Sequence, residues 1–180
     1  MRYLYMKESG KENKTPTLFC YQVDNNVWGG EYPRDFDDFT SLDKLQRFQE
    51  FGITHFIDLT EEDELKPYEQ MLWKGACYRR FPIEDGGIPD NTAAVRQLVA
   101  DIQQIIADRP NAKIYIHCWG GVGRTGQIVA SYLAINRCLD YDNTMFLLRL
   151  HFSRNPKSER RVVPENRQQC EFIRRICEGK

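Results

Sequence analysis

Short apolar runs alternate with longer amphipathic segments along this chain. Runs rich in β-branched and aromatic residues, each bounded by Gly, Pro, Asn or Asp, predict five strands. These strands are expected at 18–23, 26–30, 53–59, 77–83 and 113–117. Strands that alternate with helical patterns are typical of a parallel sheet covered on both sides. We therefore expect an α/β fold with a mainly parallel four- to five-stranded sheet and helices on both faces.

Helical periodicity occupies the segments between and after these strands. The clearest case is 91–109, where apolar residues recur at helical spacing and Pro110 follows as a stop. Asp90 or Asn91 is the expected N-cap of this helix. The other helices are expected at 41–51, 67–74, 124–137, 142–152 and 164–178.

The N-terminal segment differs from the rest of the chain. Residues 7–16 are polar and show no periodicity, so we expect 1–16 to be a mobile N-terminal arm. We expect the remaining residues, 17–180, to form a single domain, because this length is ordinary for a domain with one hydrophobic core. The N-terminus lacks a signal-peptide pattern, and no run approaches the roughly 18 apolar residues of a membrane span. We therefore expect a cytoplasmic protein that does not bind membranes.

Composition removes several classes of partner and cofactor. The chain has 25 Lys plus Arg and 26 Asp plus Glu, and the resulting net charge of −1 gives no overall attraction for nucleic acid. Its six cysteines form no CxxC pair and no Cys/His arrangement with metal-ligand spacing. The sequence therefore predicts no metal site, no disulfide framework and no nucleic-acid partner.

The chemistry concentrates in IHCWGGVGRTG, residues 116–126, where a predicted strand runs through a glycine-rich loop into a helix. The N–H groups of such a loop point at one centre, and the helix dipole adds positive potential there. Arg124 contributes a planar fork of donors suited to two phosphate oxygens, and the glycines allow a tight curl. The residues expected to bind phosphate are Trp119, Gly120, Gly121, Val122, Gly123 and Arg124. The side chain of Trp119 is expected to pack at the rim or anchor the loop, without contacting substrate.

Cys118 stands at the entrance of this loop. The loop N–H groups, the helix dipole and the Arg124 guanidinium all favour its thiolate, which makes the sulfur an anionic nucleophile. A loop that holds a phosphoryl group and aims sulfur at phosphorus predicts hydrolysis through a cysteinyl phosphate, without a metal or cofactor. Thr125 is placed to donate its hydroxyl to the sulfur when the intermediate breaks down.

A leaving oxygen also needs a proton, so a carboxylic acid is expected on a neighbouring loop. Asp85, in PIEDGGIPD, follows a predicted strand at its carboxyl end, where sites of α/β sheets collect. The same carboxylate would later deprotonate the attacking water. Glu84 stays open as an alternative, whereas Asp90 fits better as a helix cap. Gly86 and Gly87 would allow the loop to move.

At these residues the chain resembles a known family. His117-Cys118 through Arg124-Thr125 is similar to the HC-x5-RT signature of the cysteine-dependent protein tyrosine phosphatases, and the small size resembles the dual-specificity branch. With PI-x-DGG-x-PD at 82–90, it is similar to the kinase-associated phosphatases and their bacterial and archaeal relatives. The resemblance implies Cys118 as nucleophile, Arg124 as phosphate clamp, Asp85 as acid and base, Thr125 as thiolate partner and His117 as support of the loop.

A weaker resemblance lies in PENRQQCEFI, residues 164–173. It is similar to the loop that positions the hydrolytic water in tyrosine-specific members of the family. Gln169 matches that loop, but Glu165 stands where those enzymes carry a glutamine. The water-positioning residue therefore stays open.

Two nucleotide-binding patterns compete for the same glycines. Residues 121–126 also fit GxGxxG, but a dinucleotide site would need a strand next and an acidic residue about 20 positions on. The segment 127–152 predicts helices instead. The GxxxxGK[ST] pattern fails because no lysine precedes Thr125.

We therefore expect a monomeric dual-specificity-type protein phosphatase acting on phosphotyrosine, phosphoserine or phosphothreonine in a phosphorylated protein or peptide. The loop residues between Cys118 and Arg124 are neutral, without the lysines that an inositol lipid or an RNA 5′ triphosphate would favour. Alternatives are a phosphatase for inositol phosphates, phosphoinositides or RNA 5′ phosphates, and a catalytically weak phospho-binding module. The basic 153–167 segment is either a solvated loop or a pocket border that selects acidic substrates.

Overall fold

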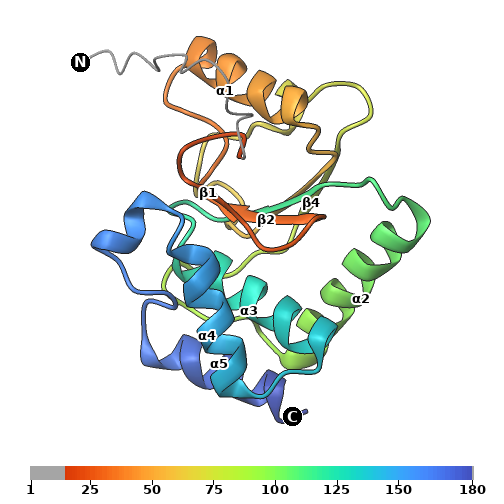
Figure 1. The fold of residues 1–180 in the computed structure, drawn as a ribbon. Coiled ribbons are helices and arrows are strands. Elements are labelled where there is room, and N and C mark those ends of the chain that lie inside the picture. Colours follow the sequence, from red (N-terminus) through yellow and green to blue (C-terminus); the bar gives the residue numbers. More distant parts are fainter. Residues whose placement is uncertain (1–14, 180) are drawn as a thin grey trace.

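The sheet contains five strands in the order β1-β2-β5-β3-β4 in the computed structural model, which describes residues 15–179 (Figure 1). Only β1 runs antiparallel to its neighbour; the other pairs are parallel. The strands are β1 (Cys20–Gln22), β2 (Val27–Gly30), β3 (His55–Asp58), β4 (Cys77–Arg80) and β5 (Ile114–His117). The predicted α/β fold with a mainly parallel sheet is confirmed.

Helices cover both faces of this sheet. Figure 1 shows α1 on one side and α2, α3, α4 and α5 on the other. The helices are α1 (Asp38–Phe51), α2 (Thr92–Asp108), α3 (Gly123–Arg137), α4 (Tyr141–Phe152) and α5 (Arg167–Cys177), with short 3-10 helices η1 (Glu69–Met71) and η2 (Pro156–Glu159). Within the described part of the chain, no helix is long and apolar enough to cross a membrane.

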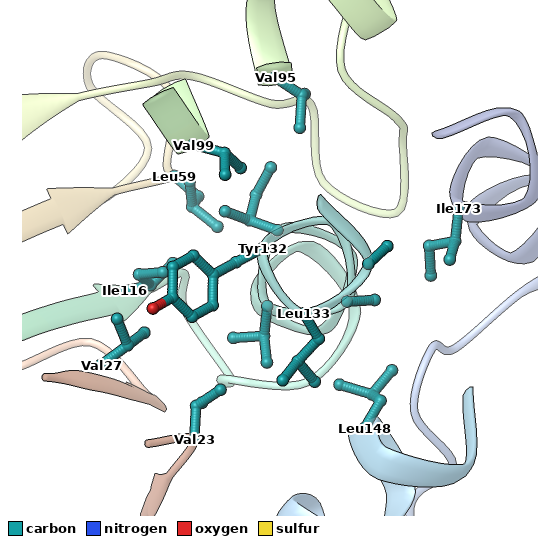
Figure 2. Packing of buried hydrophobic residues seen from close by; sticks show 14 of the residues in the cluster. Val23, Val27, Leu59, Val95, Val99, Ile116, Tyr132, Leu133, Leu148 and Ile173 are labelled. Atoms are coloured by element: carbon teal, nitrogen blue, oxygen red, sulfur yellow. The ribbon is translucent and has the colours of Figure 1, made fainter. Parts of the chain in front are cut away.

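Helix α3 lies at the centre of the larger core. Figure 2 shows Leu133 of α3 among side chains from the sheet, such as Val27 and Ile116, and from neighbouring helices, such as Leu148 and Ile173. Every residue from Gly123, at the start of α3, through Ala134 is buried. A helix that is covered on all sides has no solvent-facing polar stripe, and its buried polar groups need partners within the protein: the Gln127 amide donates to the Gly87 carbonyl and the Ser131 hydroxyl to the Gln127 carbonyl.

The helix predicted over 67–74 is wrong, because only the single 3-10 turn η1 forms there. Tyr68 is drawn fully into the core. The consecutive residues 71–73 then all pack against the same apolar cluster, which one face of an α-helix does not allow.

Two predicted helix starts move by three residues because a polar side chain caps the helix elsewhere. Helix α1 begins at Asp38 rather than 41, since the Asp37 carboxylate accepts a hydrogen bond from the Thr40 N–H. Helix α5 begins at Arg167 rather than 164, with Asn166 as its cap. At α2 the cap is Asn91, not Asp90.

The boundary predicted at the N-terminus falls mostly outside the described residues. Of the arm predicted over 1–16, residues 1–14 lie outside this part of the chain. Pro16, which belongs to the same predicted arm, is buried.

The register of the parallel strands brings their carboxyl ends to one edge of the sheet. His117 at the end of β5 lies opposite Gly30 of β2 and Asp58 of β3, and Asp58 lies opposite Arg80 of β4. The loops that follow these four strands therefore start side by side.

A buried polar network lies beneath that edge. The Nε2 atom of His117 is 2.6 Å from the Tyr68 hydroxyl. Asp58, also fully buried, accepts hydrogen bonds from the hydroxyls of Thr60 (2.7 Å) and Tyr78 (2.9 Å), and its Oδ1 lies 3.9 Å from Nδ1 of His117. Burial, only partly offset by the Asp58 charge, lowers the pKa of His117 to about 4.

This network predicts a stability loss in acid. The pKa of His117 is about 4 in the folded protein and about 6.5 in an unfolded chain. Between these values the unfolded chain binds more protons, so stability falls as the pH drops through this window. We expect His117 to remove up to about 3 kcal/mol of unfolding free energy from pH 7 to pH 4. Urea denaturation across this range should show a shallower fall in His117→Gln; equal slopes would contradict the assignment.

Candidate active site

The loop of residues 118–124 joins β5 to α3 and carries the predicted nucleophile. Cys118 directly follows β5 and is buried. Its sulfur accepts hydrogen bonds from the Gly121 N–H (3.3 Å) and the Thr125 hydroxyl (3.2 Å). Both donors stabilise negative charge on the sulfur. Both belong to the glycine-rich motif 116–126 that was identified in the sequence.

Of the three loop glycines, Gly121 has the strongest steric reason to be glycine. Gly121 has φ +73°, and a Cβ there would lie 2.4 Å from the carbonyl carbon of Gly30, because the loop crosses the end of β2. A Cβ at Gly123 would lie 2.3 Å from a carboxylate oxygen of Glu165. At Gly120, by contrast, a Cβ would meet nothing within 4 Å, so the expected tight curl does not explain that glycine.

Arg124 is a buried guanidinium surrounded by acceptors. Nη1 donates to Oε2 of Glu64 (2.6 Å) and to the Ile83 carbonyl (3.1 Å), while Nη2 donates to Oε1 of Glu64 (2.7 Å). Oδ1 of Asp85 lies 2.9 Å from Nη2. Desolvation would raise the pKa of Glu64, but the hydrogen bonds from Arg124 outweigh it and lower that pKa. The pair is therefore ionised on both sides at neutral pH.

The predicted acid loop lies against this arginine. Of the neighbouring carboxylates Glu84, Asp85 and Asp90, Asp85 is the one paired with Arg124, and its side chain is 69% exposed. The loop is fastened from behind: the Gly86 carbonyl accepts a hydrogen bond from Asn166, and the Gly87 carbonyl accepts one from Gln127 of α3. The structure thus brings Cys118, Arg124, Thr125 and Asp85 together at one edge of the sheet.

The segment before α5 closes another side of the loop. Gln169 is buried, and its Oε1 accepts a hydrogen bond from the Glu165 N–H (2.9 Å). Its Nε2 lies 3.4 Å from the Gly87 carbonyl. Glu165 pairs with Arg161. Both Gln169 and Glu165 therefore lie beside Gly123, at the start of α3.

The basic 153–167 segment reaches the loop through one lysine. Lys157 donates from Nζ to the Gly120 carbonyl (2.8 Å) and pairs with Glu31 (2.8 Å). The Trp119 carbonyl accepts a hydrogen bond from the Tyr32 N–H (3.0 Å), while 60% of the Trp119 residue is exposed. Trp119 therefore anchors the loop through its backbone and leaves its side chain at the rim.

Sequence reasoning missed Glu64 and Tyr68. Glu64 ends the acidic run at 61–64, which follows the predicted strand 53–59 at its carboxyl end. The rule that pointed to Asp85 would also have pointed to this run. Tyr68 carried no such signal, because its partner His117 is 49 positions away along the chain.

Metal ligands are not clustered in the described residues: between 15 and 179, no three His, Cys, Asp or Glu side chains are grouped to hold an ion.

Comparison with known proteins places the chain in a family. The family model described as "Polymorphic toxin system, DSP-PTPase phosphatase" matches residues 34–137. Putative tyrosine phosphatase 067L of Invertebrate iridescent virus 3 is 31% identical over 163 residues, covering 87% of this chain and 63% of the relative. Putative tyrosine phosphatase 197R of Invertebrate iridescent virus 6 is 29% identical over 121 residues, covering 67% of this chain and 42% of the relative. The chain thus spans less than two thirds of the length of either relative.

The solved structures agree on the fold. The structure of PTPMT1 in complex with PI(5)P superposes with a TM-score of 0.70 and covers 89% of this chain and 96% of its own. At 16% identity this likeness concerns the fold alone. The predicted resemblance to the dual-specificity branch of the cysteine-dependent phosphatases is confirmed. Since the family model spans more than half of the chain, including the whole 118–124 loop, the protein belongs to the DSP-PTPase phosphatase family.

Proposed function

We propose that this protein is a metal-independent dual-specificity-type protein phosphatase that works through a cysteinyl phosphate. One observation carries the proposal: the buried sulfur of Cys118 accepts two hydrogen bonds inside a loop whose Arg124 is also paired with Asp85. Nucleophile, anion clamp and carboxylate therefore share one site. Membership of a phosphatase family supports the same conclusion.

In the first step, the loop N–H groups and Arg124 bind the phosphate oxygens. All four contacts of Arg124 described above go through Nη1 and Nη2, and Glu64 occupies the edge between those two atoms. The incoming phosphate takes the Nε side of the guanidinium and displaces Asp85 from Nη2. Asp85 binds a proton from solvent once it has left the arginine. The Cys118 thiolate then forms the S–P bond as the P–O bond breaks, and Asp85 passes its proton to the leaving oxygen.

In the second step, water attacks phosphorus and the S–P bond breaks. Asp85 takes the proton from that water, and the Thr125 hydroxyl, 3.2 Å from the sulfur, stabilises the departing thiolate. The Gln169 side-chain amide accepts a hydrogen bond from the Glu165 N–H and donates one to the Gly87 carbonyl. These contacts support a role for Gln169 in holding the loop that carries Asp85.

The substrate we propose is a phosphorylated protein or peptide. Neutral side chains between Cys118 and Arg124 support this, as do the tyrosine phosphatase names of the relatives. A phosphoinositide is the second candidate, because a protein with this fold has been solved with PI(5)P. We place the protein in the cytoplasm as a monomer that needs neither nucleic acid nor membrane.

The mechanism predicts the behaviour of three variants with p-nitrophenyl phosphate in the presence of EDTA and a reductant. Wild type should turn over, and Cys118→Ser should abolish turnover because it removes the nucleophile. Asp85→Asn should lower kcat by about 10²–10⁴-fold, the usual contribution of a general acid. The loss should be larger with phenyl phosphate, whose leaving group is more basic. Glu84→Gln is the matched control and should stay near wild type.

Three outcomes would change this assignment. A large loss in Glu84→Gln with an active Asp85→Asn would make Glu84 the acid. Activity that disappears with EDTA would overturn the metal-independent mechanism. An inactive wild type that still binds vanadate or a phosphopeptide would identify a phosphate-binding module instead.

Glu64 gives a separate prediction, because it holds Arg124 without blocking the Nε side. Glu64→Gln replaces one of the two acceptor oxygens with a donor, so the bidentate grip is lost. We expect the Ki for inorganic phosphate and the KM for substrate to rise about tenfold, the size of one charge-assisted hydrogen bond. The exposed neighbour Glu62 provides the control Glu62→Gln. Tighter phosphate binding in Glu64→Gln would show that Glu64 competes with substrate instead of positioning the arginine.

A further inference from the structure

A cavity of about 340 Å³ adjoins the phosphate-binding loop on the side of α1. Trp119, which directly follows Cys118, forms one wall, and Glu64, which holds Arg124, forms another. Groups that neighbour a phosphate held in the loop are therefore within reach of this cavity. The volume lies within the range of about 300–1,000 Å³ seen for pockets that take small ligands.

The cations that line the cavity are already paired with carboxylates. Nζ of Lys44 lies 3.1 Å from Glu31 and 3.2 Å from Asp35. Arg34 and Lys66 share the carboxylate of Asp38. A second phosphate would have to break one of these pairs and would face the remaining carboxylates. The charge pattern therefore disfavours a polyphosphorylated inositol headgroup as the occupant.

Apolar side chains provide a second part of the lining, and two of them are solvent-exposed. Phe36 is fully exposed, and Trp119 and Leu65 stand on other parts of the wall. Beyond Phe36, the exposed side chains of Phe39 and Leu42 continue at three-residue spacing along the start of α1. Exposed aromatic side chains beside a pocket are typical of protein-binding surfaces.

We propose that this cavity seats an apolar side chain of a polypeptide substrate, next to its phosphorylated residue. The inference rests on the proposed phosphatase function and specifies its substrate as a protein rather than a lipid headgroup or a free inositol phosphate. Phe36 and Trp119 supply exposed apolar surface for that side chain, and the largely covered ion pair of Lys44 and Glu31 forms a polar part of the lining. Removal of these apolar surfaces from water provides the selectivity.

The test uses a series of short phosphopeptides with an alanine background and a single leucine moved through each position beside the phosphorylated residue. Sets with phosphotyrosine and with phosphothreonine are compared with a short-chain phosphatidylinositol phosphate. Leucine at one position should raise kcat/KM about tenfold over the alanine peptide, the effect expected for burying much of that side chain. Phe36→Ala should reduce this leucine-to-alanine ratio toward one. Phe146→Ala, which removes an aromatic ring exposed on α4 across the sheet, should leave the ratio unchanged.

Binding measurements separate this inference from the proposed function. Cys118→Ser keeps the loop N–H groups and Arg124, so the Kd values of the same peptides report on the cavity without turnover. If leucine lowers the Kd but the wild-type protein hydrolyses none of the peptides, the docking site would stand and the proposed phosphatase function would be refuted. Hydrolysis with the same kcat/KM for every peptide, or a leucine preference that survives Phe36→Ala, would overturn the docking site. A higher kcat/KM for the inositol lipid than for any peptide would also overturn it.

Discussion

The guanidinium of Arg124 is carried into the protein interior and cannot give up its charge there, so acceptors must be brought to it. Glu64 comes from the segment after β3, and Asp85 with the Ile83 carbonyl comes from the segment after β4. Arg124 itself lies on α3, which follows β5. The segments after two neighbouring strands, β3 and β4, therefore bring acceptors to a cation that follows the third, β5. The order of these loops and the shape of the anion site are consequences of the same electrostatic requirement.

The two carboxylates on Arg124 are not equivalent. Glu64 is largely covered and accepts two charge-assisted hydrogen bonds in parallel, the strongest geometry available to an arginine. Asp85 is mostly exposed, so solvent screens its attraction to the guanidinium. One acid is thus a permanent part of the site, and the other is free to exchange its place with a phosphate oxygen. This difference suits Asp85 to a role that requires movement of a proton and of the side chain.

Sequence reasoning succeeded where the information is local. The composition of each strand and the apolar spacing of each long helix can be seen within the segment itself. The 118–124 loop likewise holds the nucleophile, the glycines and the arginine in one contiguous motif. It failed where a residue's place depends on a distant partner. The place of Tyr68 is set by His117 and not by the helical pattern of 67–74. The acidic run 61–64 had the same signal as Asp85, but which of its carboxylates reaches Arg124 depends on β3 lying beside β5. Such pairings are created by sheet order, which a single sequence does not display.

The hydrogen bonds behind Asp85 also affect the thermodynamics of turnover. Gly86 and Gly87 suggest a loop that becomes ordered only when substrate binds. In the free protein, however, their carbonyls accept hydrogen bonds from the side-chain amides of Asn166 and Gln127. Ordering a flexible residue costs about 1–2 kcal/mol of conformational entropy at room temperature. A loop that is already ordered avoids that cost on closure. The activation entropy of the first step then contains little of this ordering cost.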